Sequence, residues 1–154
     1  MNKLQNETPM RPLVVRQTVS WGHCDPAGII YTPRVLDYAI ETLEAWNREF
    51  LGVSWIRLNK EMSLGFPTVR SELDFFRPPA VDHVIDLGLE VLEVGRSSLT
   101  TLITGRDNGG VDYFRVKLVS CLISVPDYTP QEIPDDFRNK IHAYQSACQE
   151  TLCK

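Results

Sequence analysis

The feature that most constrains the fold of this chain is one segment of helical periodicity within a sequence otherwise rich in strand patterns. Thr32 can cap such a helix, Pro33 can occupy its first turn, and Gly52 can end it. The apolar residues that recur at helical spacing between these signals are Leu36, Ala39, Ile40, Leu43, Trp46 and Phe50. The sequence therefore predicts one long amphipathic helix whose apolar stripe must be covered by other elements.

The segments around this helix alternate apolar and polar residues, as half-buried strands do. Residues 13–21 place Leu13, Val15, Val19 and Trp21 on one side of a first strand. Four further strands are predicted at residues 69–76, 84–94, 97–104 and 111–125, with a hairpin signal in Asp107-Asn108-Gly109-Gly110. A C-terminal helix is predicted at about residues 134–150. One long helix beside a single antiparallel sheet is an α+β architecture.

Size and charge indicate one domain, and they exclude several classes of partner. A chain of 154 residues with 43% hydrophobic residues can bury a core as one domain over residues 1–154, with a flexible N-terminus at about 1–10. The net charge of -4 and the lack of a basic face argue against a nucleic-acid partner. With no apolar run typical of a secretory signal or a membrane span, we expect a cytoplasmic protein that does not bind membranes.

The four cysteines show no CxxC spacing and no paired histidines, so neither a zinc site nor a disulfide framework is predicted.

The residues that carry chemistry lie between the first strand and the helix, in the segment 21–31, Trp-Gly-His-Cys-Asp-Pro-Ala-Gly-Ile-Ile-Tyr. Pro26 disfavours the α region for Asp25, so the carboxylate is presented on extended backbone, and Gly28 permits a turn. A helix N-terminus with unpaired N–H groups follows. A carboxylate beside preorganised donors suits acyl transfer, although an Asp-Pro pair in a loop can also be a turn residue only.

This segment, His23-Cys24-Asp25-Pro26-Ala27-Gly28-Ile29-Ile30-Tyr31, resembles the signature of the 4-hydroxybenzoyl-CoA thioesterase family. Weaker similarity continues through Phe75-x-x-Pro78 and residues 95–98, so that it covers about residues 13–125. The resemblance implies a hotdog fold, in which a five-stranded antiparallel sheet wraps a long central helix. It also implies a homo-oligomer, dimer or tetramer, with active sites between subunits.

The resemblance also assigns roles to residues. Asp25 corresponds to the catalytic carboxylate, as nucleophile or general base, and the backbone N–H of Thr32 to the group that polarises the thioester carbonyl. Gly28 and Tyr31 are expected at the substrate, and Arg96 is the best candidate to contact the coenzyme A phosphates, with Arg77 and Arg106 as weaker ones. No metal or cofactor is implied other than the coenzyme A of the substrate.

Some nearby residues support alternative readings of the site. His23 stands where relatives can have an acidic residue; it could contact Asp25 from the same side of the chain and support that carboxylate, or be a solvated histidine. Cys24 cannot form a dyad with His23 if adjacent residues point to opposite faces. Glu41 and Glu44 on the helix are the rival carboxylates.

The predicted function is therefore hydrolysis of an acyl-CoA thioester, with an aromatic acyl group favoured by the motif. A short-chain acyl-CoA or acyl carrier protein thioesterase is the alternative. A hotdog dehydratase that uses His23 and Asp25 as an acid–base pair is disfavoured by the Asp-Pro-Ala-Gly run, and a non-catalytic acyl-CoA sensor is disfavoured by the intact Asp25.

Overall fold

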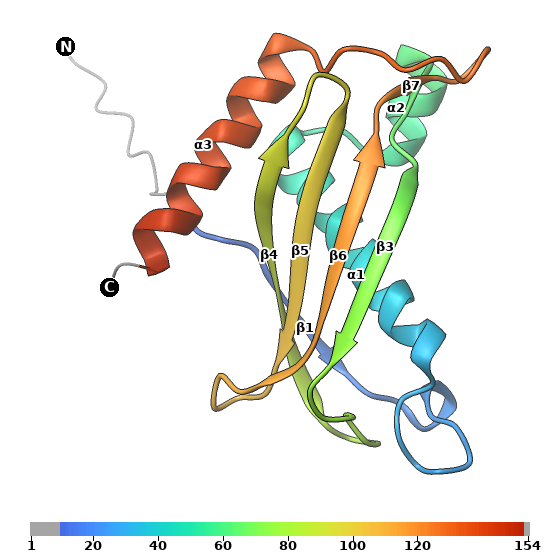
Figure 1. Ribbon diagram of the computed structural model, residues 1–154, viewed down its shortest axis with the longest axis vertical. Coiled ribbons are helices and arrows are strands. Elements are labelled where there is room, and N and C mark those ends of the chain that lie inside the picture. Colours follow the sequence, from blue (N-terminus) through green and yellow to red (C-terminus); the bar gives the residue numbers. More distant parts are fainter. Residues whose placement is uncertain (1–9, 153–154) are drawn as a thin grey trace, which may run out of the picture.

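The computed structural model describes residues 10–152 and contains a five-stranded antiparallel sheet in the order β1-β4-β5-β6-β3 (Figure 1). Its strands are β1 (Val14–Thr18), β3 (Thr68–Phe75), β4 (Val84–Val94), β5 (Ser98–Arg106) and β6 (Asp112–Cys121). The predicted α+β hotdog architecture is confirmed. Apart from Met10, the N-terminus expected to be flexible lies outside the described residues.

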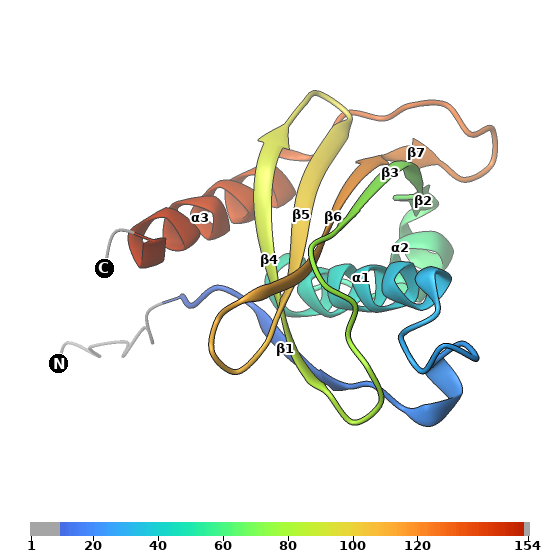
Figure 2. The ribbon, with the colours of Figure 1, turned by 60° about the horizontal axis from the view of Figure 1, so that its bottom comes forward.

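Helix α1 (Thr32–Trp46) lies across one face of the sheet (Figures 1 and 2). Its buried residues are Val35, Tyr38, Ala39, Thr42, Leu43 and Trp46. A π-helical turn, η2 (Asn47–Leu51), continues the helix to Gly52, which has a left-handed φ of 73°. The predicted stop at Gly52 is therefore confirmed. The predicted cap at Thr32 is wrong, because Tyr31 is the N-cap, without a side-chain hydrogen bond, and Thr32 is already helical.

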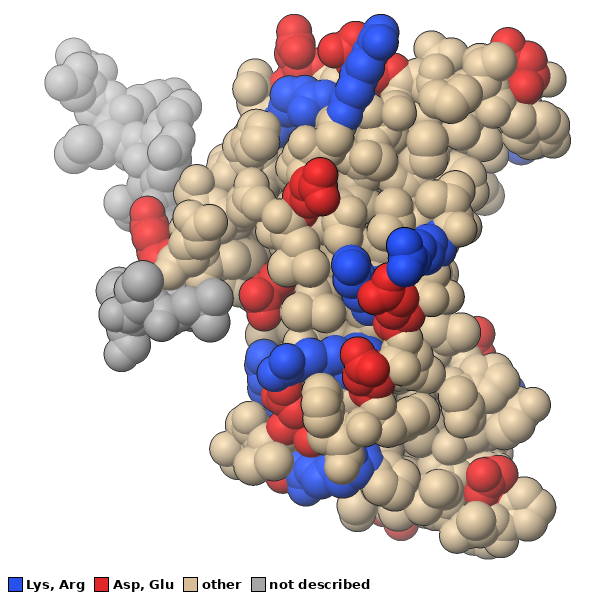
Figure 3. Space-filling model, in the orientation of Figure 1, with Lys and Arg blue, Asp and Glu red and all other residues tan. Residues whose placement is uncertain are grey.

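The two faces of the sheet carry different kinds of side chain, because successive residues of a strand point to opposite faces. The face toward α1 carries buried side chains such as Leu87 on β4, Ile103 on β5 and Val116 on β6. On the opposite face acidic and basic side chains lie next to one another (Figure 3), for example Arg16 beside Asp86 and Lys117 beside Glu72. Such exposed pairs add little to stability and keep this face polar.

Two short elements were not predicted from the sequence. Residues 53–67, which show no clear pattern, contain α2 (Trp55–Met62) and β2 (Leu64–Gly65), and β2 pairs with β7 (Ile123–Ser124). Helix α2 buries only Leu58, so its apolar periodicity is too short to recognise. Because β7 belongs to this second pairing, the long strand predicted at residues 111–125 is broken after Cys121.

The first strand is also shorter than predicted. It ends at Thr18, and residues Trp21–His23 form a 3₁₀ turn, η1. Trp21, predicted on the buried side of that strand, is 81% exposed. The alternation is therefore lost once the backbone leaves the sheet.

Helix α3 (Asp135–Leu152) covers part of the edge of β4 that β1 leaves unpaired. The buried Tyr144 hydroxyl accepts a hydrogen bond from the Leu13 N–H at 3.0 Å and donates to the Leu89 carbonyl at 2.6 Å. Gln145 donates to the Val91 carbonyl at 3.1 Å. Side chains thereby satisfy backbone groups that would otherwise form an open sheet edge. No helix within residues 10–152 is long and apolar enough to cross a membrane.

We expect Tyr144→Phe to lower the free energy of unfolding by about 1–3 kcal/mol, because the Leu13 N–H and Leu89 carbonyl lose their buried partner. Urea denaturation measures the loss. Tyr128→Phe is the matched control, since Tyr128 is 73% exposed. Equal stability of the two variants would show that the hydroxyl does not hold this edge.

Candidate active site

The loop that carries Asp25 is a tight hairpin. Cys24 pairs with Ile30, the Asp25 N–H donates to the Ile29 carbonyl at 2.9 Å, and the Gly28 N–H donates to the Asp25 carbonyl at 2.9 Å. Gly28 has a φ of 78°, which glycine adopts without strain. This is a three-residue hairpin loop with a left-handed glycine, so the Asp-Pro-Ala-Gly sequence encodes its own turn.

The Asp25 side chain both stabilises this turn and keeps one oxygen free. Its Oδ1 accepts a hydrogen bond from the Ala27 N–H at 2.8 Å, as an aspartate in a turn commonly does. No residue within 10–152 donates a hydrogen bond to Oδ2. Both expectations for Asp25, turn residue and presented carboxylate, are thus compatible in one conformation.

The half-buried Asp25 lines an open cavity of about 300 Å³. The residues around this cavity are Trp21, Cys24, Asp25, Pro26 and Gly28. Of the two residues expected at the substrate, Gly28 lines this cavity, whereas Tyr31 is exposed beside the helix start and is not among the lining residues. The indole of Trp21 was not expected at this place.

The start of α1 lies beside the same hairpin. The Tyr31 N–H donates to the His23 carbonyl at 2.8 Å, so the chain enters α1 next to the segment that bears Asp25. The Thr32 N–H is a first-turn amide, and no acceptor within residues 10–152 bonds to it. With the positive end of the helix dipole, this exposed donor can stabilise a developing negative charge.

His23 does not hydrogen-bond to Asp25. Its Nδ1 lies 2.6 Å from the hydroxyl of Tyr38, a buried residue of α1, and the two rings meet edge to face with centroids 5.5 Å apart. Burial raises the pKa of Tyr38, and a hydrogen bond from Gln17 partly offsets this rise. His23 therefore connects the Asp25 hairpin to the helix. Tyr38 is not one of the apolar residues that defined the predicted helix, so the predicted stripe did not indicate this contact.

The other residues considered for catalysis are less well placed than Asp25 relative to the cavity. Glu41 is exposed, Glu44 is paired with Arg48, and neither lines the cavity beside Asp25. Cys24 lines that cavity, but the adjacent imidazole is held by Tyr38.

Arg96 lies far from Asp25 within this chain. It sits in the connection between β4 and β5, at the end of the sheet opposite the Asp25 hairpin (Figure 1). Its side chain is 83% exposed and lies 3.4 Å from Glu132. One copy of the chain therefore does not bring Arg96 and Asp25 into one site.

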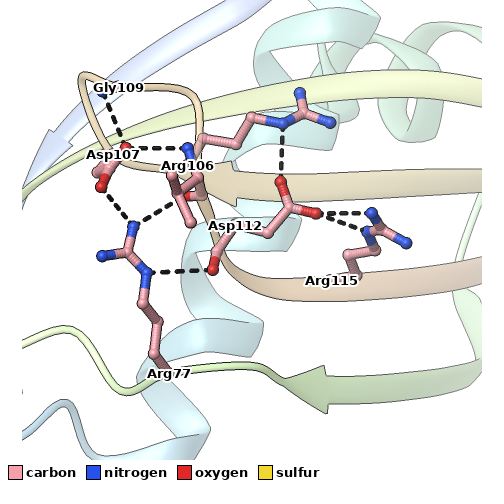
Figure 4. A network of polar contacts seen from close by, with 7 residues as sticks. Arg77, Arg106, Asp107, Gly109, Asp112 and Arg115 are labelled. Carbon is pink, nitrogen blue, oxygen red and sulfur yellow. Dashed lines mark hydrogen bonds and ion pairs between the residues drawn. The ribbon is translucent and has the colours of Figure 1, made fainter.

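Arg77 and Arg106 are engaged in a network around the β5–β6 hairpin (Figure 4). Arg77 binds Asp107 and the carbonyls of Val111 and Asp112, and its guanidinium stacks 4.1 Å from the centre of the Tyr113 ring. Arg106 donates to Asp112, which also binds Arg115. These contacts indicate that both arginines hold the hairpin in place.

A larger cavity of about 500 Å³ lies between α1, α2 and the β2–β7 pair. Its lining is mainly apolar and carries no charged residue; it consists of Ile40, Leu43, Trp55, Asn59, Gly65, Phe66, Pro67, Thr68, Ile123, Val125 and Tyr128. Within the described residues, no group of three His, Cys, Asp or Glu side chains is arranged to hold a metal ion.

The chain belongs to the thioesterase-like superfamily, whose family model matches residues 19–141. It is thus a thioester hydrolase with a hotdog fold. A crystal structure of a thioesterase superfamily protein from Jannaschia sp. CCS1 is 30% identical, with 85% of this chain and 91% of that chain covered and a TM-score of 0.78. A Staphylococcus aureus protein, solved in complex with CoA, is 14% identical, with 90% and 87% covered and a TM-score of 0.82.

Among curated proteins, the 1,4-dihydroxy-2-naphthoyl-CoA hydrolase of Prochlorococcus marinus (strain NATL2A) is 24% identical over 113 residues, which are 69% of this chain and 72% of that protein. These similarities confirm the thioesterase class. The finer resemblance to 4-hydroxybenzoyl-CoA thioesterases stays a prediction.

Proposed function

We propose that this thioesterase hydrolyses an acyl-CoA thioester to a free acid and coenzyme A, with Asp25 as the catalytic carboxylate. The observation that carries the proposal is the Asp25 Oδ2 in an open cavity, beside a helix start; within residues 10–152 no group donates to that oxygen and no acceptor binds the Thr32 N–H. The CoA bound to the Staphylococcus aureus protein of the same fold supports CoA as the thiol part of the substrate.

Two chemical routes fit this arrangement. As a general base, Asp25 takes a proton from water, the water oxygen bonds to the carbonyl carbon, and the C–S bond breaks to release the thiolate, which is then protonated. As a nucleophile, Asp25 attacks the carbonyl carbon, the C–S bond breaks and the thiolate leaves to be protonated, and a mixed anhydride remains; water then hydrolyses the anhydride to release the acid and regenerate the Asp25 carboxylate. In both routes the Thr32 N–H stabilises the negative charge on the carbonyl oxygen. Neither route requires a metal or a redox cofactor.

An aromatic acyl group is the favoured substrate. This proposal rests on the resemblance of residues 23–31 to the 4-hydroxybenzoyl-CoA family, and the name of the Prochlorococcus marinus relative, a hydrolase of an aromatic acyl-CoA, supports it. Release of free thiol from a panel of aroyl-, short-chain and long-chain acyl-CoAs tests the choice. Similar rates on acyl carrier protein thioesters would assign the alternative carrier.

The active protein is a homo-oligomer in which two copies build each site. Asp25 and Arg96 lie at opposite ends of the sheet, so a substrate that meets both needs Arg96 from a second copy. Strand β3 offers the surface for this, because it is an edge strand with one side unpaired. Antiparallel pairing of two β3 edges about a two-fold axis brings opposite ends of the two sheets together.

We expect Asp25→Asn to lower kcat by about 10²–10⁴, because the amide can neither accept the proton nor attack the thioester. Thiol release under saturating substrate measures the loss. Glu41→Gln and Glu44→Gln are the matched controls and should stay within a few-fold of normal. A folded Asp25→Asn variant with normal kcat would falsify the role of Asp25 as the catalytic carboxylate. Loss of activity in either control variant would instead assign that role to the replaced glutamate of α1.

Thr32→Pro tests the backbone donor, because it removes the N–H at the first helical position, where proline is tolerated. Tyr31 already has the extended conformation that a following proline requires, with φ -67° and ψ 123°. We expect kcat to fall by about 10²–10³, as on removal of one oxyanion donor. Thr32→Ala keeps the N–H and should retain kcat. If both variants behave alike, another group polarises the carbonyl.

Arg96→Ala is expected to raise KM for the acyl-CoA about tenfold with little change in kcat, because phosphate contacts are made equally in the ground and transition states. The same acyl group on pantetheine, which lacks the nucleotide, should show no change. Arg57→Ala, at an exposed arginine of α2 paired with Glu61, is the control. An unchanged KM for the full CoA thioester would exclude Arg96 from phosphate binding.

A further inference from the structure

Trp21 is the most exposed large hydrophobic residue among residues 10–152, with 81% of its surface in contact with solvent. No hydrogen bond from its indole N–H to any of those residues is formed. A bare indole on the surface forgoes the stabilisation that burial of a large aromatic ring provides. Tryptophan is enriched at interfaces, where its ring is covered by a binding partner.

Hydrogen bonds fix the backbone that carries the exposed indole. In the 3₁₀ turn η1, the His23 N–H donates to the Ser20 carbonyl at 2.9 Å, and the Cys24 N–H donates to the Trp21 carbonyl at 3.1 Å. The His23 ring is attached to the buried Tyr38 hydroxyl at 2.6 Å. These contacts fix the backbone of Trp21 in the turn between β1 and the Asp25 hairpin.

The exposed indole lines the same cavity as Asp25. Among the lining residues Trp21 is the one large aromatic group and Asp25 the one charged group. When the reacting carbon of a ligand lies at Asp25, the adjacent part of that ligand therefore contacts the indole of Trp21.

We propose that Trp21 is a specificity-determining residue, whose indole forms one wall of the acyl subsite and favours flat, aromatic acyl groups over short aliphatic ones. This inference rests on the proposed function. A planar aroyl group stacks on an indole with an offset geometry, which adds to the gain from area burial alone. The CoA phosphates do not fit this position, because the cavity contains a carboxylate and no cation.

Trp21→Ala and Trp21→Phe test the proposal, with benzoyl-CoA and butyryl-CoA as substrates. We expect Trp21→Ala to lower kcat/KM for benzoyl-CoA by at least about tenfold more than for butyryl-CoA, and Trp21→Phe to recover most of this loss because a ring remains. The matched control is Ile56→Ala, at a residue of α2 that is 76% exposed and not part of the site. Equal losses on the two substrates, or no loss, would overturn the role of Trp21.

A binding measurement separates this inference from the proposed reaction. In the Asp25→Asn background, benzoyl-CoA should change the tryptophan fluorescence, and Trp21→Phe should abolish that change although Trp46 and Trp55 remain. Dissociation of the oligomer by Trp21→Ala in light scattering would instead show that a second copy covers the indole, which overturns the inference. A wild-type protein that hydrolyses no thioester of the panel would overturn the proposed function itself.

Discussion

The passage from β1 into α1 is the constraint on which the rest of the site depends. Within the residues between Thr18 and Thr32 the chain leaves a sheet edge, makes a 3₁₀ turn, reverses at Gly28 and begins a helix. A glycine in the left-handed conformation and a residue restricted by the following proline achieve this reversal without strain. Backbone hydrogen bonds from Asp25, Gly28 and Tyr31 then fix the relative positions of the carboxylate and the first helical amide.

Much of this arrangement could be predicted because it is encoded locally. The Asp-Pro-Ala-Gly run predicts the turn, the apolar stripe predicts α1, and alternation predicts the five strands. Local signals failed where tertiary packing decides the outcome. Trp21 continues an alternating pattern but lies beyond the last sheet hydrogen bond, and the partner of His23 is fifteen residues away on another element. Helix α2 is too short to have a recognisable pattern of its own.

The two ends of the sheet are held by different contacts. At one end lies the Asp25 hairpin, next to the backbone of the segment after β3, since Ile30 donates to the Pro79 carbonyl at 2.9 Å. At the other end, the β4–β5 turn carries Arg96 and is tied to the chain before α3, because the Ile133 N–H donates to the Arg96 carbonyl at 2.9 Å. The length of the sheet therefore separates Asp25 from Arg96 within one copy.

The buried phenols also couple folding to proton release. Burial raises the pKa of both Tyr38 and Tyr144 above the ordinary value of 10.0. Their contribution to stability is therefore complete below about pH 10, where both states keep the proton, and declines as the pH rises above it, because the unfolded chain ionises first. In alkaline solution the chain gives up protons as it unfolds. The Tyr38 hydroxyl joins the hairpin to α1, and the Tyr144 hydroxyl joins α3 to the sheet edge. Both contacts are therefore sensitive to strong base.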